Sequence, residues 1–531
     1  MILITFLVVT VAVALFSWLK TRKERTGSFN GIFFANRRLG FVSVGFGLLF
    51  TNINTTSFIG ENELTYINNM SVMAWGVTSV AAMMLVSEFI IPIYLKTGIA
   101  TTPDFLEARY DRATKSIVSV IFLANYIFNL LPGVLYGSAV GFEGLFNISG
   151  NFRIDSWAAI WVLVWATGIC GVLYAVLGGL KAITISDTLL GFALFTGGIL
   201  LPYFALKFLG EGNWHQGLHI ILSSKTVHLN SIGKPYDSIP FGTIFTGMML
   251  VNIYYWGTEQ YIVQQALGSR DLASCQKGIA LASSGKLVLP LLLNIPGVIA
   301  AHLYNNLSNS SIVFSKLAAD VAPPVYSGFL AAILFGATLT TFVAGLNSSV
   351  TLFVLNIYNP IKAKRKEAIE KNGDLAVARK AQVFFAFIAI LIAPFIFFAS
   401  GGFYNYLQKL SGLFSIPILT IMVVGLLTKR VPALAAKVGL VFFMVCYGCS
   451  QFVFPTRLHF LHVLALLFVV TVLLMLVIGR RKPMPVPFEL KMNNIVNINP
   501  WKYNRIVALL LVLASVLLFI LFSPAGLVKT D

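Results

Sequence analysis

A run of polar side chains interrupts the hydrophobic segment between about residues 39 and 68: Thr51, Asn52, Asn54, Thr55, Thr56 and Ser57. The segment is long enough to cross a bilayer, whose hydrocarbon offers no hydrogen-bond partners to side-chain amides or free carbonyls. The run, which continues to Gly60, is therefore either a face packed against other helices or a break that lines a cavity. Ser, Thr and Asn commonly join membrane helices, which favours packing. A break would indicate ion or solute binding, because discontinuous helices carry the binding sites of secondary transporters.

A second interruption begins at Asn252 and continues through Tyr255 and Trp256 to Gly257 and Glu259. Two polar, Gly-interrupted spans at corresponding places in two halves of a chain are a sequence pointer to a transporter site. The aromatic rings either pack in the core or act as gates and stack on sugar faces. The second stretch therefore shifts the interpretation of the first towards a binding site.

Three threonines lie close together in a third apolar segment, at Thr338, Thr340 and Thr341. A single Thr in a membrane helix usually bonds its own backbone, and three in four positions exceed that need. Small hard cations prefer oxygen ligands. Neutral hydroxyl and carbonyl oxygens suit a weakly held monovalent ion that must be released in each transport cycle.

Ionisable residues inside apolar segments are functional candidates by default. They are Glu61, Glu63, Glu88, Glu143, Asp187, Glu259 and Lys286. Glu88 and Glu143 lie towards segment ends, which indicates an interfacial position. Lys286 requires water, a carboxylate or a polar ligand, so an ion pair with Glu259 or Asp187 and a substrate contact both remain open.

The chain has 531 residues, of which 57% are hydrophobic and 11% are charged. Soluble domains carry about 25% charged residues, so the composition predicts a single polytopic, all-α membrane domain. We expect about fourteen spans of crossing length. They lie near residues 1–19, 39–68, 71–95, 113–146, 156–178, 182–209, 241–268, 275–303, 322–358, 380–400, 406–428, 432–454, 458–479 and 504–523.

The net charge of +18 would suit a nucleic-acid partner. However, if the N-terminus is outside the cell, most Lys and Arg residues fall in the inner loops, as the positive-inside rule requires. The basic residues then face the anionic cytoplasmic leaflet, and no nucleic-acid partner is expected. An even number of spans places both termini outside. The histidines are scattered and form no clustered catalytic or metal site, so we expect no enzyme.

The motifs resemble those of the sodium/solute symporter family, specifically its bacterial sodium/galactose-type (sodium/glucose cotransporter) branch. The similarity covers nearly the whole chain and includes residues 51–60, 98–110, 178–179 with 186–187, 252–256 with 260–261, 276–278 and 346–348. The resemblance implies a LeuT-like core, an inverted five-plus-five helix repeat whose first and sixth helices are broken. It places a leading helix at 1–19, the repeats at 39–209 and 241–428, and trailing helices at 432–523.

The resemblance also implies roles for individual residues. A sodium site would use the carbonyls of Phe50, Ile53 and Ala337 and the hydroxyls of Thr340 and Thr341, with Asp187 near the exit route of the ion. Polar substrate contacts would come from Asn52, Ser57, Ser79, Asn252, Lys286 and Gln408, beside a gate formed by Tyr255 and Trp256. The chain departs from the family at Ser57 and Gly76, where a Gln and a Glu are usual, and at Glu61 and Glu63, which add charges.

We therefore expect a sodium-coupled symporter in the cell membrane that imports a sugar, a polyol such as inositol, or another small polar solute by alternating access. Na⁺ is the expected coupling ion, and no organic cofactor is expected. Several alternatives remain open: a carboxylate, amino acid or vitamin as the solute, proton coupling through Asp187, Glu61 or Glu63, and an uncoupled channel or sensor. The sequence leaves the oligomeric state open.

Overall fold

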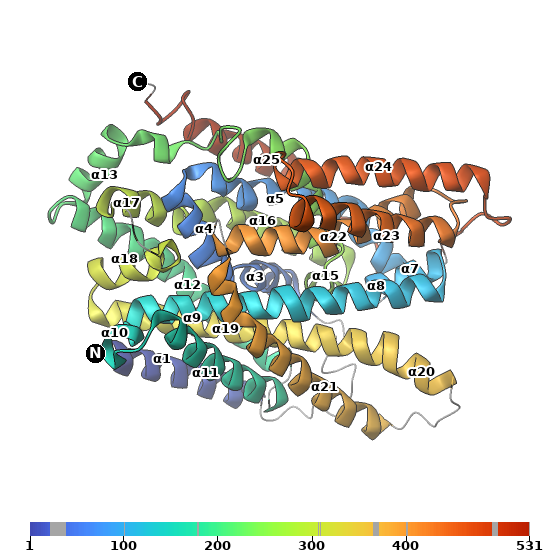
Figure 1. Cartoon of the computed structure of the whole chain (residues 1–531), viewed down its shortest axis with the longest axis horizontal. Helices are drawn as coiled ribbons and strands as arrows, with labels where there is room; N and C mark the ends of the chain where they lie inside the picture. Colours follow the sequence, from blue (N-terminus) through green and yellow to red (C-terminus); the bar gives the residue numbers. More distant parts are fainter. Residues whose placement is uncertain are drawn as a thin grey trace.

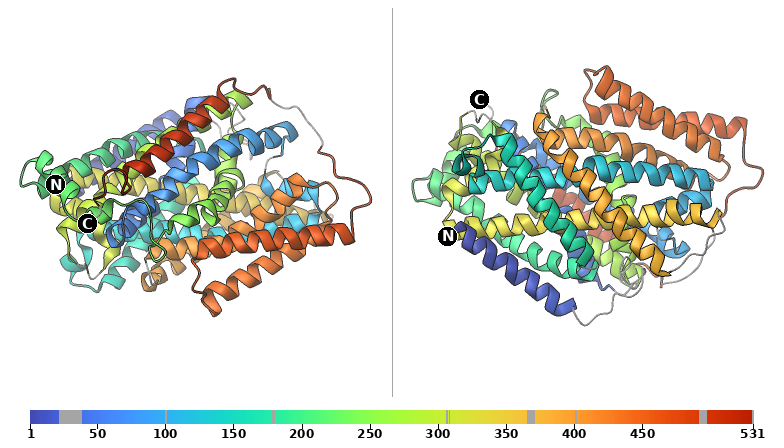
Figure 2. Two further views of the ribbon diagram at one scale, coloured as in Figure 1. Left: turned by 90° about the horizontal axis from the view of Figure 1, so that it is seen from above. Right: turned by 60° about the horizontal axis from the view of Figure 1, so that its bottom comes forward.

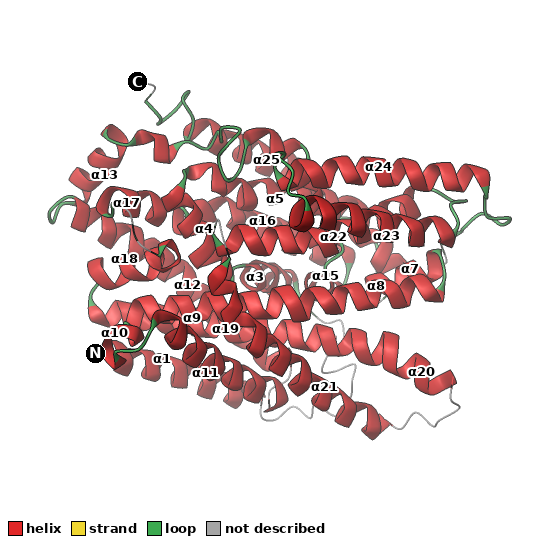
Figure 3. Cartoon of the chain, in the orientation of Figure 1, coloured by secondary structure: helices red, strands yellow, loops and turns green. Residues whose placement is uncertain are grey.

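The computed structural model describes residues 1–21, 39–99, 101–177, 180–305, 307, 309–364, 371–399, 402–490 and 497–529. Helices make up nearly all of the regular structure in these residues (Figures 1 and 3), and the pairing of extended backbone is limited to two isolated bridges. In chain order the longer helices are α1 (Ile2–Thr21), α3 (Phe41–Asn52), α4 (Thr55–Ile67), α5 (Ala74–Leu85), α6 (Ile91–Thr97), α7 (Thr102–Arg109), α8 (Arg112–Asn125), α9 (Leu131–Phe146), α11 (Ser156–Leu177), α12 (Leu180–Leu209), α13 (Trp214–Ser223), α14 (Gly247–Gly257), α15 (Gln260–Leu267), α16 (Leu272–Leu293), α17 (Ile295–Leu303), α18 (Val313–Val321), α19 (Pro324–Phe353), α20 (Asn359–Lys364), α21 (Lys371–Ile392), α22 (Phe403–Leu427), α23 (Ala433–Gly448), α24 (Phe460–Arg481) and α25 (Asn504–Leu521).

Each predicted apolar segment coincides with helical structure, and the all-α membrane fold is confirmed. By length and composition, 10 described helices could each cross a membrane, and a bent pair raises the number to 11. The predicted count of about fourteen is not confirmed. Among the described residues, α1 contributes an apolar stretch of only Ile2–Phe16, and α12 one of Gly197–Leu209. Helices α14 and α15 are each too short to span alone.

The first polar stretch is a break between α3 and α4, whose axes differ by 54°. Helix α3 ends at Asn52, and Ile53 leaves the helical conformation. Asn54 then begins α4 as an N-cap in extended conformation, where its side chain accepts a hydrogen bond from the amide of Ser57 at 2.9 Å. An Asn cap satisfies an amide that a broken helix would otherwise leave unpaired in the membrane. The alternative of an unbroken packing face is wrong for this segment.

The second polar stretch is also a break, between α14 and α15. Gly257 ends α14, and Thr258 and Glu259 connect it to α15. The amides of Thr258 and Glu259 both bond the carbonyl of Tyr254, at 2.7 and 3.0 Å. The chain therefore has discontinuous helices at the two places where the sequence predicts them.

Helix α19 lies in the core and packs against α1, α9, α11 and α12, while α16 packs against α3 and α5. The approach of α16 to α3 depends on glycine. A Cβ at Gly45 would lie 2.9 Å from the carbonyl oxygen of Gly278, and a Cβ at Gly278 would lie 2.8 Å from Val44. Small residues allow such close backbone contact in membranes. The trailing helices α23 and α24 lie side by side at one edge of the molecule (Figure 2).

Four of the predicted spans contain a π-helical turn. Two of these turns lie nearer to the middle of their spans than the others. One is Val86–Ile90, between α5 and α6, and the other is Tyr126–Leu130, between α8 and α9. Such turns often occur at functional sites, because the wider turn inserts a residue and changes which side chains face a neighbour. The second turn is next to the cavity described below.

Candidate functional site

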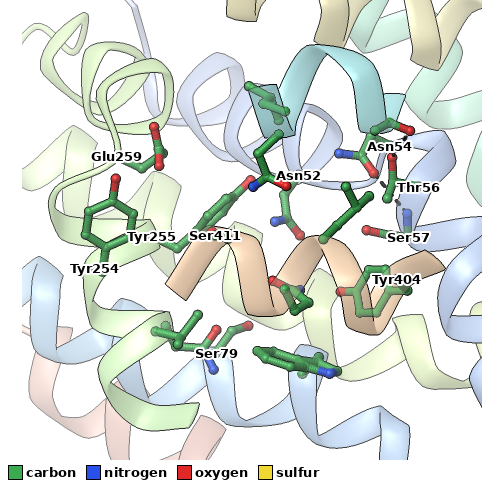
Figure 4. A pocket seen from close by; sticks show the side chains of 18 of the residues that line it. Asn52, Asn54, Thr56, Ser57, Ser79, Tyr254, Tyr255, Glu259, Tyr404 and Ser411 are labelled. Atoms are coloured by element: carbon green, nitrogen blue, oxygen red, sulfur yellow. Dashed lines mark hydrogen bonds between the residues drawn. The ribbon is translucent and has the colours of Figure 1, made fainter. Parts of the chain in front are cut away.

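A cavity of about 160 Å³ lies between the two broken helices. Its walls come from the break between α3 and α4, from α5, from the π-turn at Tyr126–Leu130, and from α14, α16 and α22 (Figure 4). The structure brings all the predicted substrate and gate residues to this cavity. They are Asn52, Ser57, Ser79, Asn252, Lys286, Gln408, Tyr255 and Trp256.

The break in the first helix places Asn52 and Ser57 at the cavity. Asn52 ends α3 and Ser57 lies in the first turn of α4, so the bend presents both helix ends to the same space (Figure 4). The carboxylate-bearing Glu61, one turn further along α4, also lines the cavity. Glu63 does not line it; it accepts a hydrogen bond from Ser310 at 2.7 Å.

Lys286 extends from α16 to the cavity, where its side chain is buried. Its ammonium donates a hydrogen bond to the Asn52 side chain and lies 5.7 Å from the centre of the Trp256 ring. The ion pair with Glu259 that the sequence left open is absent from the ion pairs of the described residues. Lys286 is thus held by an amide and an indole face, which leaves its remaining donors available to a solute.

Helices α5 and α14 meet at a polar contact. The amide of Asn252 donates to the Thr78 hydroxyl at 3.0 Å, and the Ser79 hydroxyl donates to the carbonyl of Gly76 at 2.6 Å. A Cβ at Gly76 would meet no atom within 4 Å. The cavity therefore has room for a side chain at position 76, where this chain has a glycine.

The predicted gate residues lie together at the second break. The rings of Tyr255 and Trp256 meet edge to face with centroids 5.2 Å apart. The hydroxyl of Tyr261 donates to that of Tyr255 at 2.8 Å. This bond connects α15 to α14 across the break.

Several lining residues were not predicted from the sequence. They include Asn54, Trp75, Asn125, Tyr126, Asn129, Tyr404 and Ser411. Asn125 and Asn129 are four residues apart in an apolar helix and bond each other at 3.1 Å, a spacing that could have indicated a polar helix face. Tyr404 and Ser411 gave no comparable signal, because α22 reaches the cavity only through long-range packing.

The predicted ion-binding residues lie where α19 passes the first break. The hydroxyls of Thr55 and Thr338 are 2.7 Å apart, and Thr55 also donates to the carbonyl of Leu334 at 3.1 Å. These contacts attach the start of α4 to α19 one turn before Thr341. Phe50, Ile53 and Ala337 are buried beside this junction.

Two kinds of oxygen at this junction fit a small cation. The buried Thr341 hydroxyl has no hydrogen-bond partner in the described part of the chain. Among the described residues, none of the backbone hydrogen bonds around the break is accepted by the carbonyl of Phe50 or of Ile53. Thr340 differs, because its hydroxyl donates to the Ala337 carbonyl at 3.3 Å. Unpaired buried oxygens are costly in hydrocarbon, and a bound cation would satisfy them.

Asp187, the predicted residue of the ion exit route, belongs to α12, but its side chain lies outside the described residues.

Comparison with known proteins adds an independent line of evidence. The model of the sodium:solute symporter family matches residues 32–442. The uncharacterized symporter YidK of Escherichia coli is 39% identical over 514 residues, which cover 97% of this chain and 90% of that protein. The sodium/glucose cotransporter of Vibrio parahaemolyticus is 29% identical over 467 residues, covering 83% of each.

Solved structures have the same fold. A Na⁺-coupled sialic acid symporter superposes with a TM-score of 0.76 at 18% sequence identity, covering 92% of this chain and 98% of that one. The nucleobase-cation-symport transporter Mhp1, in a closed conformation, gives a TM-score of 0.56 at 12% identity, covering 90% and 98%.

Proposed function

The chain belongs to the sodium:solute symporter family, and we propose that it imports a sugar or polyol together with Na⁺ by alternating access across the cell membrane. Its family and structural neighbours are transporters and not enzymes. Sodium-coupled symport of a small solute is the general activity of this family. The identity of the solute, the cell membrane as its location and the outside position of both termini are proposals.

The cavity between the two breaks carries this proposal. Its polar lining consists mainly of amides and hydroxyls, which can both donate and accept hydrogen bonds. The members are Asn52, Asn54, Thr56, Ser57, Ser79, Asn125, Asn129, Asn252, Gln408 and Ser411. Seven aromatic rings complete the wall: Trp75, Tyr126, Tyr254, Tyr255, Trp256, Tyr261 and Tyr404. Hydroxyl groups of a sugar or polyol match such polar groups, and the apolar faces of a sugar ring match the aromatic ones.

Sodium binding and solute binding would be coupled because both sites use residues of the first break. A sodium ion bound by Phe50, Ile53, Ala337, Thr340 and Thr341 would fix the end of α3, which also carries Asn52 at the cavity. Sodium binding would thus order the solute site. By reciprocity, the solute would increase the affinity for sodium by the same factor. Release to the cytoplasm would follow when the helices separate past Tyr255.

A carboxylate-bearing solute is a second candidate, and the position of Lys286 favours it. A buried ammonium with free donors is a natural partner for a carboxylate. The Vibrio relative, which is named for glucose, favours the sugar instead.

The test is uptake by purified protein in proteoliposomes with an imposed sodium gradient. A panel of radiolabelled sugars, polyols, sugar acids and amino acids should reveal one class that accumulates above its external concentration. Accumulation should disappear with an equal potassium gradient and in the Thr340→Ala, Thr341→Ala double variant. Uptake driven equally well by a pH gradient without sodium would contradict the proposal and indicate proton coupling.

A further inference from the structure

We propose that Glu61 makes the cavity select an uncharged polyhydroxy solute and reject carboxylates, an inference that rests on the transport function proposed above. Glu61 is one of the two charges by which the chain departs from the family pattern.

Glu61 is held in a defined position beside the cavity. Gly60 allows α22 to approach α4 closely, since a Cβ at Gly60 would lie 2.6 Å from the Cβ of Tyr404. The Tyr404 hydroxyl hydrogen-bonds Glu61, and its ring meets the edge of Trp75 with centroids 6.3 Å apart. The Glu61 side chain is only 7% exposed. The Glu61 side chain therefore has a fixed position in the cavity wall and is not an exposed, mobile carboxylate.

The cavity places opposite charges on different walls. Among the described lining residues, the basic side chain is Lys286 on α16, and the carboxyl groups belong to Glu61 on α4 and Glu259 at the second break. Lys286 and Glu61 attract each other electrostatically, but no ion pair joins them in the described part of the chain. Both residues line the same cavity.

A solute in this cavity meets an acceptor, Glu61, and a donor, Lys286. A hydroxyl group can accept from the Lys286 ammonium and donate to the Glu61 carboxylate at the same time. A solute carboxylate would gain Lys286 but would face Glu61 in a medium of low dielectric constant, where like charges repel strongly. A solute ammonium would face Lys286 in the same way. Glu259, whose oxygen already accepts from Tyr126, is a second carboxyl group on the cavity wall.

This arrangement decides between the two candidate solutes. Lys286 considered alone favours a carboxylate, whereas Lys286 and Glu61 together favour a neutral polyhydroxy compound. Glu61 thereby becomes a specificity-determining residue for the charge of the solute.

The test uses pairs of sugars that share one ring and differ in charge: glucose with glucuronate, galactose with galacturonate, and glucose with glucosamine. In sodium-driven proteoliposomes the wild-type protein should take up the neutral member of at least one pair in preference to its acid. Glu61→Gln keeps the size and a hydrogen-bonding oxygen but removes the charge. It should lower the neutral-to-acid ratio of uptake rates by about tenfold or more, because a nearby like charge has been removed.

Glu63→Gln is the matched control, because Glu63 is equally buried on the same helix but does not line the cavity. It should leave the ratio unchanged. Wild-type uptake of a uronate at least as fast as its neutral partner would overturn the inference, even if Glu61→Gln fails to fold. An unchanged ratio in a folded Glu61→Gln protein would overturn it as well.

Failure of the transport proposal has a different signature, namely that no solute of any charge accumulates under a sodium gradient. In that case, quenching of tryptophan fluorescence by the same sugar pairs reports binding directly, because Trp75 and Trp256 line the cavity. Binding of the neutral member alone would support the charge selection, and equal binding of both members would refute it.

Discussion

The hydroxyl of Tyr126 donates a hydrogen bond of 2.5 Å to the carboxylate of Glu259. Tyr126 begins the π-turn between α8 and α9, and Glu259 lies in the break between α14 and α15. Both side chains are buried. The bond thus joins the segment predicted as the first repeat, residues 39–209, to that predicted as the second, residues 241–428. A movement that separates these two elements must break it.

We expect Tyr126→Phe to destabilise the state seen here by about 1–3 kcal/mol, because it deprives a buried carboxylate of a donor. The apparent melting temperature of the purified protein should fall. In a double-mutant cycle with Glu259→Gln, the two changes should be non-additive by more than about 0.5 kcal/mol. Purely additive effects would show that the two residues act independently.

Thr341→Ala should raise the sodium concentration for half-maximal uptake by about tenfold, the factor that corresponds to a loss of about 1.4 kcal/mol of ion binding. Thr341→Ser should retain normal sodium dependence, because it keeps the hydroxyl oxygen. Ser349→Ala is a suitable control on the same helix, since the Ser349 hydroxyl bonds its own backbone at Gly345. The assignment fails if Thr341→Ala and Ser349→Ala give the same sodium curve.

Arg109 connects α7 to the end of α22. Its guanidinium donates to the carbonyls of Gly425 at 2.9 Å, Thr428 at 3.0 Å and Val431 at 3.1 Å. The ammonium group of a lysine cannot reproduce the planar arrangement of N–H donors in a guanidinium. Arg109→Lys should therefore cost about 2–4 kcal/mol of stability, since bonds from charged donors are strong and buried carbonyls would lose their partners.

Thermal unfolding in detergent would measure this cost. Arg112→Lys provides the control, because Arg112 is more exposed and its hydrogen bond within the described part of the chain is a 3.5 Å contact with the carbonyl of Pro360. Equal melting temperatures for the two variants would mean that the bonds of Arg109 contribute little.

Acid should weaken the junction at the start of α24. Burial lowers the pKa of His459 to about 4. Its Nε2 lies 3.0 Å from the carbonyl of Ser238, and its Nδ1 accepts from the amide of Leu461 at 3.4 Å. In the unfolded chain the pKa of a histidine is near 6.5, so between these values the unfolded state binds a proton that the folded state does not. The stability that neutral His459 contributes is therefore present above about pH 6.5 and is lost as the pH falls towards 4.

Melting curves between pH 7.5 and pH 5 would test this dependence. His459→Asn keeps a capping side chain but cannot titrate, so its melting temperature should fall less over this range. Identical slopes for the two proteins would assign the acid sensitivity to other groups.

The helical segments could be predicted from the sequence because runs of apolar residues must form helices to satisfy their backbone in a membrane. The breaks could be predicted as well, since amides and glycine at residues 51–60 and 252–260 have no place on a lipid-facing helix. The predicted number of about fourteen spans is not confirmed, because 10 or 11 spans are found among the described residues. A helix that breaks, such as α14 with α15, looks like one apolar segment in the sequence.

The site was predictable where the polar residues belong to the breaks themselves, as with Asn52 and Asn252. Tyr126 and Tyr404 escaped prediction because aromatic residues are common in membrane helices, and only packing across long sequence distances brings them to the cavity. The hydrogen-bond partner of Lys286 could not be predicted from the sequence either. A buried ammonium demands some acceptor, but the sequence does not show that Asn52 supplies it and that Glu61 lines the same cavity.

The break at Ile53 and Asn54 divides one long helix into two shorter electric dipoles. The end of α3 presents carbonyl groups and a partial negative charge, which suits a cation. The start of α4 carries the opposite partial charge and would attract an anionic group, but the Asn54 side chain already occupies one of its amides, that of Ser57. The C-terminal end of α3 is therefore free to attract a cation, whereas the partial positive charge at the start of α4 is already partly neutralised by the Asn54 side chain.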